Sequence, residues 1–245
     1  MPKGIEKNFK RIEKKYIINK EEIDNVLADL KEYLVEDEYP VSTITNIYFD
    51  TYDFQVIKDS IEKRNGREKI RMRSYEESPS QSSKVFLELK KKDHEGVGHK
   101  FRLVAELGAI NRFIEKGEVV ATSFEDEELI RELGTLRKRY QGLSPRMFIY
   151  YDRYSLKERH QIVGQPQTKI RVTIDKNLTY RDYDVNMENG VYGHDLVDDG
   201  KVIMEIKAPG EQPLWLREIL EKHGLEPASF SKYGTAYRKS QGILQ

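Results

Sequence analysis

Charged and apolar residues alternate along much of the chain with a period of two. Three consecutive segments show this pattern most clearly, namely residues 67–75, 84–92 and 99–106. In the second of them, Glu88 and Lys90 alternate with apolar residues. Side chains on a β-strand point alternately to the two faces of a sheet, so residues two apart share a face. The pattern therefore predicts strands that have one apolar face and one mainly cationic face.

Further segments of the same kind bring the expected total to about eight strands. These additional strands are predicted over residues 9–18, 43–49, 146–154, 169–175 and 202–207. Apolar residues at helical spacing predict helices between them. The expected helices cover residues 19–34, 110–116, 124–140 and 213–223, with a last helix beginning near Ser231. Asn19 and Glu22 together form a capping-box-like start for the first helix.

The distribution of charge on the predicted strands bears on how the sheet is arranged. Each predicted helix has one apolar face and can cover the apolar side of the sheet, which would turn the charged side inward. Cations buried without partners are costly, so such an interior requires water, acidic partners or a polyanion. The alternative is an ordinary antiparallel sheet with its polar face in water. The recurrence of the pattern favours an α+β fold, with a closed antiparallel eight-stranded β tunnel or barrel, a charged interior and helices packed outside. We expect residues 1–245 to form it as a single domain.

Composition narrows the possible partners. The chain has 42 basic and 42 acidic residues, and this balance counts against a non-specific nucleic-acid binder. The absence of cysteine excludes disulfides, thiolate nucleophiles and cysteine metal sites. No signal peptide and no apolar run of membrane-spanning length are present, so we expect a cytoplasmic protein without a membrane segment.

Several charged motifs follow one another in a characteristic order. They are Arg-x-Glu-x-Lys-Tyr at residues 11–16, Arg71-x-Arg73, Glu88-x-Lys90 with Lys100 and Arg102, Arg146, Arg171-x-Thr-x-Asp175, Glu205-x-Lys207, and Ser231-Lys232-Tyr233. No single motif is specific. Their order and spacing over residues 11–237 resemble a stand-alone VTC-type polyphosphate polymerase domain of the triphosphate tunnel metalloenzyme superfamily. In this family an antiparallel tunnel binds triphosphate or polyphosphate, and a divalent metal sits on acidic tunnel residues.

The resemblance implies a role for each motif residue. The phosphate-gripping, catalytic residues would be Lys15, Arg71, Arg73, Lys90, Lys100, Arg146, Arg171 and Lys232. Further substrate-binding residues would be Arg11, Arg102, Lys207 and Tyr150. Glu205 would be the main ligand of Mn²⁺ or Mg²⁺, with Glu13 and Glu88 as lesser candidates.

One departure from the family pattern concerns the reaction. Triphosphatase and cyclase relatives usually begin with Glu-x-Glu-x-Lys, whereas this chain has Arg11 at the first position. The change strengthens phosphate binding at the expense of metal binding and favours ATP-dependent polyphosphate synthesis. The substrates implied are ATP or another nucleoside triphosphate, together with polyphosphate or triphosphate, and no nucleic acid. Two alternatives stay open, namely an inorganic triphosphatase or nucleoside triphosphatase in the same tunnel, and a non-catalytic polyphosphate or nucleic-acid binder.

Overall fold

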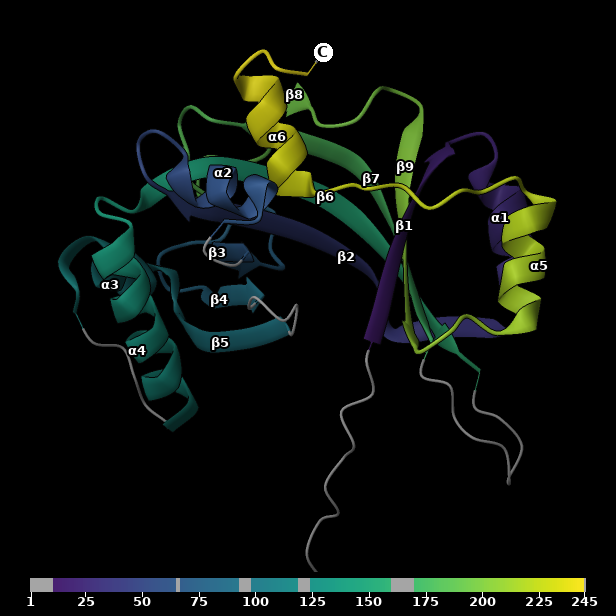
Figure 1. Ribbon diagram of the computed structural model, residues 1–245, viewed down its shortest axis with the longest axis horizontal. Helices are drawn as coiled ribbons and strands as arrows, with labels where there is room; N and C mark the ends of the chain where they lie inside the picture. Colours follow the sequence, from purple (N-terminus) through teal and green to yellow (C-terminus); the bar gives the residue numbers. More distant parts are fainter. Residues whose placement is uncertain (1–10, 65–66, 93–97, 119–123, 160–169, 245) are drawn as a thin grey trace, which may run out of the picture. The chain divides into compact units, whose positions relative to one another are not determined.

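The computed structural model describes residues 11–64, 67–92, 98–118, 124–159 and 170–244 (Figure 1). The strands are β1 (Arg11–Asn19), β2 (Leu34–Asp50), β3 (Arg67–Ser74), β4 (Lys84–Lys92), β5 (Gly98–Glu106), β6 (Ser144–Glu158), β7 (Arg171–Arg181), β8 (His194–Asp195) and β9 (Lys201–Pro209). The helices are α1 (Ile23–Leu30), α2 (Gln55–Glu62), α3 (Leu107–Lys116), α4 (Phe124–Arg139), α5 (Leu214–Lys222) and α6 (Lys232–Ser240). No helix in these ranges is long and apolar enough to cross a membrane.

The strands form a nine-stranded sheet in the order β1-β9-β7-β6-β2-β3-β4-β5, with β8 beside β7. The pairs β1/β9, β7/β9, β2/β3, β3/β4 and β4/β5 are all antiparallel. The α+β class and the antiparallel sheet predicted from the sequence are therefore confirmed. Within the described residues, the hydrogen-bonded order ends at β1 and β5 and does not close on itself. Closure into a tunnel stays a prediction.

The largest difference from the sequence-based expectation lies at the first helix. Residues 19–34 were expected to be helical, but Asn19 ends β1, where it pairs with Lys201, and α1 covers only Ile23–Leu30. The capping box is absent because Glu22 is the N-cap and makes no side-chain cap hydrogen bond. Strand β2 then begins at Leu34, nine residues before the expected strand. The expected starts at residues 9 and 169 lie outside the described ranges.

Contacts between residues divide the chain into two compact units. The first unit comprises Met1–Ser42, Asp152–Asn177 and Val197–Phe230. The second unit comprises Thr43–Tyr151, Leu178–Leu196 and Ser231–Gln245. Strands β2, β6 and β7 contribute residues to both units. The single domain predicted from the sequence is not tested by this division.

The core of the first unit joins helices α1 and α5 to strands β1, β7 and β9. Ile23 and Val26 of α1 are buried with Leu216 of α5, and the two helices are in contact. Tyr16 of β1 and Met204 of β9 belong to the same cluster. The apolar positions of these strands thus face the helices.

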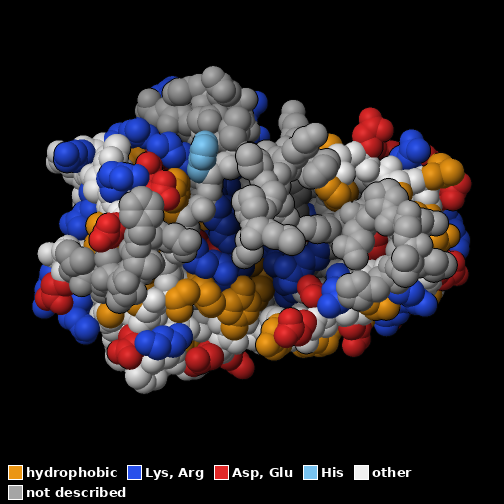
Figure 2. All heavy atoms as spheres, turned by 90° about the horizontal axis from the view of Figure 1, so that it is seen from below, with side chains coloured by type: hydrophobic (Ala, Val, Ile, Leu, Met, Phe, Trp, Pro, Cys, Tyr) orange, Lys and Arg blue, Asp and Glu red, His pale blue; other side chains and the backbone are white. Residues whose placement is uncertain are grey.

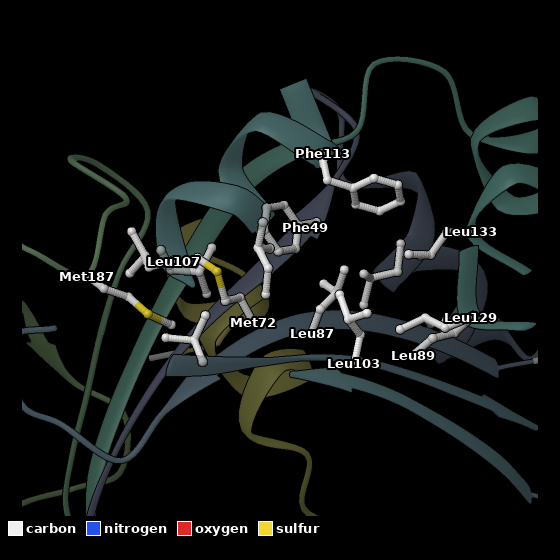
Figure 3. Packing of buried hydrophobic residues seen from close by; sticks show 14 of the residues in the cluster. Phe49, Met72, Leu87, Leu89, Leu103, Leu107, Phe113, Leu129, Leu133 and Met187 are labelled. Carbon is white, nitrogen blue, oxygen red and sulfur yellow. The ribbon is translucent and has the colours of Figure 1, made fainter. Parts of the chain in front are cut away.

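The core of the second unit lies between β3–β5 and the helices α3 and α4 (Figures 1 and 3). The strand residues Met72, Leu87, Leu89 and Leu103 pack with Leu107 and Phe113 of α3 and with Leu129 and Leu133 of α4. The helices cover the apolar face of these three strands, as the alternation predicts. Consequently, the other face of β3–β5 carries the charged positions.

Helix α6 is fixed to the second unit by its first turn. Ser231 caps the helix by accepting a hydrogen bond from the Gly234 backbone N–H (3.2 Å). The ring of Tyr233 stacks on that of Tyr48 (4.5 Å between centroids), and its hydroxyl donates to Asp50 (2.7 Å). Asp50 also accepts hydrogen bonds from three backbone N–H groups, those of residues 51, 56 and 57. The buried carboxylate therefore ties the start of α2 to the start of α6.

We expect Tyr233→Phe to lower the free energy of unfolding by about 1.5 kcal/mol, because the buried Asp50 carboxylate loses a charge-assisted hydrogen bond. Urea unfolding measures the change. Tyr237→Phe on the same helix is the matched control, because the Tyr237 hydroxyl has no hydrogen bond to the described chain. Equal loss in the two variants would show that the Asp50 bond does not anchor the helix.

Candidate functional site

The registers of β3, β4 and β5 line up charged residues in rows across their outer face. One row consists of Lys69, Lys90 and Lys100, and the next of Arg71, Glu88 and Arg102. Side chains directly opposite on antiparallel strands lie about 5 Å apart, and like charges there are destabilising. The three lysines of the first row therefore repel one another across the strands. Figure 2 shows Lys and Arg side chains gathered beside hydrophobic ones on one face of the molecule.

Glu88 is the counter-ion of this cationic face. Its side chain is 0% exposed. Oε2 accepts from Nε (2.8 Å) and Nη2 (2.7 Å) of Arg71. Oε1 accepts from Nε (2.9 Å) and Nη2 (2.6 Å) of Arg102 and from Nζ of Lys100 (2.9 Å). A single buried carboxylate thus holds three cations that project from the two neighbouring strands.

The electrostatics of this group favour its ionised form. Burial by itself would raise the pKa of Glu88, but Arg71 and Arg73 outweigh burial and hold that pKa well below its usual range. Burial would lower the pKa of Arg71, but nearby Tyr48 and Glu88 raise it. Glu88 and Arg71 are therefore both charged at neutral pH.

Arg73 lies one row further along β3 and is fixed by neutral groups. Its Nε donates to Asn46 Oδ1 (2.9 Å) and its Nη2 donates to the Tyr151 hydroxyl (3.0 Å). Lys232, at the start of α6, lies over the ring of Tyr151 with Nζ 4.5 Å from the centroid. Two of the predicted phosphate-binding cations, on β3 and on α6, therefore meet at one tyrosine.

The pKa of Tyr48 reflects the positive charge of the surrounding side chains. The side chain is almost fully buried, and burial alone would raise the pKa of its hydroxyl. Arg71, Arg73 and Lys69 outweigh burial and lower the pKa to about 8. A buried phenol with a lowered pKa indicates a strongly positive potential, which also favours phosphate groups.

On the helix-covered face of the same strands, charged residues at the edge form ion pairs with residues of opposite charge on α4. Glu68 accepts from Arg139 of α4 (2.7 Å), and Lys91 pairs with Glu132 of α4 (3.2 Å). The excess of cations is thus confined to the outer face of β3–β5.

The first unit contains a second group of predicted site residues, on β1 and β9. Glu13 lies opposite Lys207, and Lys15 lies opposite Glu205. Lys207 pairs with both carboxylates, at 3.7 Å from Glu13 and closer to Glu205. Lys15 pairs with Glu13 (3.2 Å) and donates to the backbone carbonyl of Phe230 (3.0 Å). Four predicted site residues therefore lie together here, with balanced charge.

The two charged motif residues of β7, Arg171 and Asp175, differ in their exposure. Arg171 is exposed and pairs with Asp37 (3.0 Å). Asp175 is buried and binds Arg153 of β6 through two parallel hydrogen bonds, of 2.7 and 2.8 Å. Arg153 was not predicted from the sequence, although it lies two residues after the buried Tyr151 and so shares its face of β6. The side chain of Arg11, the remaining predicted residue, lies outside the described part.

The alternation of β6 places Arg146 and Tyr150 on the face of the strand opposite to that of Tyr151. The Arg146 guanidinium lies over the rings of Tyr52 and Phe54, at 5.2 and 4.8 Å. Tyr150 belongs to the apolar core of the second unit. Tyr151, on the opposite face of the strand, is the tyrosine that contacts Arg73 and Lys232. The alternation of side chains along β6 could have identified Tyr151 as the tyrosine on this face.

The carboxylates differ in their fitness to hold a divalent metal. Both oxygens of Glu88 already accept from three cations, so Glu88 does not fit a metal ligand. Glu13 and Glu205 share one ammonium group, that of Lys207, so a positive charge already lies between them. Mg²⁺ typically needs only one or two carboxylates when substrate phosphates complete the shell. A metal held by Glu13 and Glu205 would have to displace the Lys207 ammonium, and with that change these two carboxylates stay the predicted ligands. Among the described residues, no three His, Asp or Glu side chains gather into a metal-binding group.

We expect Glu88→Gln to lower the free energy of unfolding by about 3 kcal/mol, because three cations lose their buried counter-ion and an amide cannot replace the charge. Chemical denaturation measures the loss. Glu106→Gln on β5 is the control, because the exposed pair of Glu106 with Lys84 (3.4 Å) contributes little and its loss should change stability by less than about 0.5 kcal/mol. Tripolyphosphate should restore more stability to Glu88→Gln than it adds to the wild type. Wild-type stability in Glu88→Gln would contradict the counter-ion role.

Two solved structures resemble this chain distantly. A protein from Vibrio parahaemolyticus described as a candidate adenylate cyclase has a TM-score of 0.44 and 11% identity, with 93% of this chain and 97% of that chain covered. The Mediator head module of Schizosaccharomyces pombe has a TM-score of 0.39 and 11% identity, with 86% and 90% covered. Likenesses at these scores support no statement about this chain.

Comparisons of sequence are more informative. Subunit 4 of the vacuolar transporter chaperone complex of Schizosaccharomyces pombe is 23% identical over 277 residues, covering 94% of this chain. The aligned part is 37% of that subunit, so the chain spans little more than a third of the relative's length. The model of the VTC domain family matches residues 10–241, which is nearly the whole chain. The resemblance seen in the charged motifs is thereby confirmed, and the chain belongs to the VTC domain family.

Proposed function

We propose that this chain binds polyphosphate or triphosphate on the outer face of β3–β5 and uses ATP to synthesise polyphosphate. The observation that carries the proposal is the row of Lys69, Lys90 and Lys100, which lies beside the Arg71–Glu88–Arg102 row. Membership of the VTC domain family supports the same reading.

The charge pattern favours a compact, highly charged anion. Opposed lysines repel each other, and Lys100, Arg71 and Arg102 already share the single carboxylate of Glu88. Phosphate oxygens bind both kinds of cation on this face, because the guanidinium group forms paired hydrogen bonds and the ammonium group acts as a point charge. The zero net charge of the whole chain counts against general binding to nucleic acid. A concentrated positive patch on a neutral protein suits a phosphate chain better.

The proposed reaction needs mainly positioning and neutralisation of charge. Phosphoryl transfer requires the attacking and leaving oxygens to be in line, with little covalent help from the protein. Arg71, Arg73 and Lys232 would bind and orient phosphate groups, because each is held by a neighbouring side chain. In the first unit, Glu13 and Glu205 would hold Mg²⁺ or Mn²⁺, and such an ion neutralises the charge of a phosphate group that it binds.

The test is incubation with ATP and Mn²⁺, followed by gel analysis for long-chain polyphosphate and an assay for orthophosphate. We expect metal-dependent polyphosphate. The double variant Lys90→Ala/Lys100→Ala should lower the yield more than tenfold, because two cations leave the lysine row. Lys84→Ala on the same strand is the control, since Lys84 pairs with Glu106 at the surface and should retain activity.

Other products would identify a different function. Orthophosphate without chain growth would identify a triphosphatase. Binding of tripolyphosphate with no turnover of ATP would identify a non-catalytic binder. Full activity of the lysine double variant would remove the lysine row from the site.

A further inference from the structure

The outer face of β3–β5 changes character one row beyond Glu88. There the register places Arg73 opposite Phe86, and Phe86 opposite Val104. Val104 is 51% exposed, because side chains alternate along β5 and residues 103 and 105 turn toward the core on the other face. Tyr75 follows directly after β3 and is 46% exposed. Apolar and aromatic side chains thus reach solvent on the face that otherwise carries cations.

These side chains form one continuous surface with the cationic rows. The ring of Tyr75 meets that of Phe86 edge to face, at 5.5 Å between centroids and an angle of 87°. The guanidinium of Arg102 lies over the ring of Phe86 at 4.5 Å. Burial would raise the pKa of Tyr75, but Arg73 outweighs burial and lowers it. Tyr75 is therefore close enough to Arg73 for the positive charge to stabilise its phenolate.

This juxtaposition suits a ligand with a flat apolar ring at one end and phosphates at the other. We propose that Tyr75, Phe86 and Val104 form the docking surface for the base of a nucleoside triphosphate whose phosphates lie on the neighbouring Arg71–Glu88–Arg102 row. Successive rows on one face are about 6.6 Å apart along the strand. Aromatic side chains stack on any base, so the surface should tolerate different bases. The proposal rests on the proposed function and adds a subsite for the nucleoside to it.

The experiment compares two ligands that share phosphates and differ in the base. Calorimetric titration gives the Kd of ATP and of tripolyphosphate for the wild type, Tyr75→Ala and Tyr75→Phe. We expect Tyr75→Ala to weaken ATP about tenfold, within the range for loss of one stacked ring, and to leave tripolyphosphate unchanged within about twofold. Tyr75→Phe keeps the ring and should retain wild-type affinity for both ligands. Tyr39→Ala, at another exposed tyrosine, is the control and should change neither Kd.

The outcomes separate this inference from the function on which it rests. Wild-type ATP affinity in Tyr75→Ala would overturn the inference, as would equal weakening of ATP and tripolyphosphate, which would mean that Tyr75 only supports the cations. In both cases the phosphate site itself would stand. Failure of the wild-type protein to bind tripolyphosphate would overturn the phosphate site, and the base subsite with it. A thermal unfolding midpoint close to that of the wild type shows that Tyr75→Ala is folded.

Discussion

The second unit depends on one constraint, the repulsion between cations that the registers of β3, β4 and β5 place opposite one another. Glu88 relieves part of it by binding Arg71, Lys100 and Arg102 through a fully buried carboxylate. Lys69 of the same face also donates to the Ser231 hydroxyl (2.9 Å). The fold therefore keeps positive charge concentrated where a structural sheet would alternate signs, and a bound polyanion would complete the balance.

The helices make this arrangement stable. Leu129 and Leu133 of α4 cover the apolar face of the same strands, and Arg139 and Glu132 match the charges at its edge. Because the core forms on one face only, the other face is free to carry groups that weaken the fold. Helix α6 adds Lys232 to this face, and the buried Tyr233–Asp50 hydrogen bond holds the helix in place.

The sequence predicted the strands well where alternation is strong, and the rows of β3–β5 follow directly from it. The sequence did not predict the strand at residues 34–42, because most residues at the start of β2 are polar and show no alternation. The helical spacing of apolar residues before β2 also continues to Leu34, so the predicted helix was too long. The sequence did not identify Tyr151, which lies on the other face of β6 from Arg146 and Tyr150 and contacts Arg73. The role of Glu88 could not be predicted, because motif spacing does not reveal that three cations occupy its two oxygens.

The ionisation of Tyr48 shows whether phosphate chains bind on the cationic face of the second unit. Difference absorbance of the phenolate between the wild type and Tyr48→Phe isolates this group. We expect ionisation near pH 8, because Arg71, Arg73 and Lys69 favour the phenolate. Saturating tripolyphosphate should move the transition to higher pH, because bound phosphates neutralise those cations. An ionisation near pH 8 that tripolyphosphate leaves unchanged, although it binds the protein, would mean that the phosphates bind away from Arg71, Arg73 and Lys69.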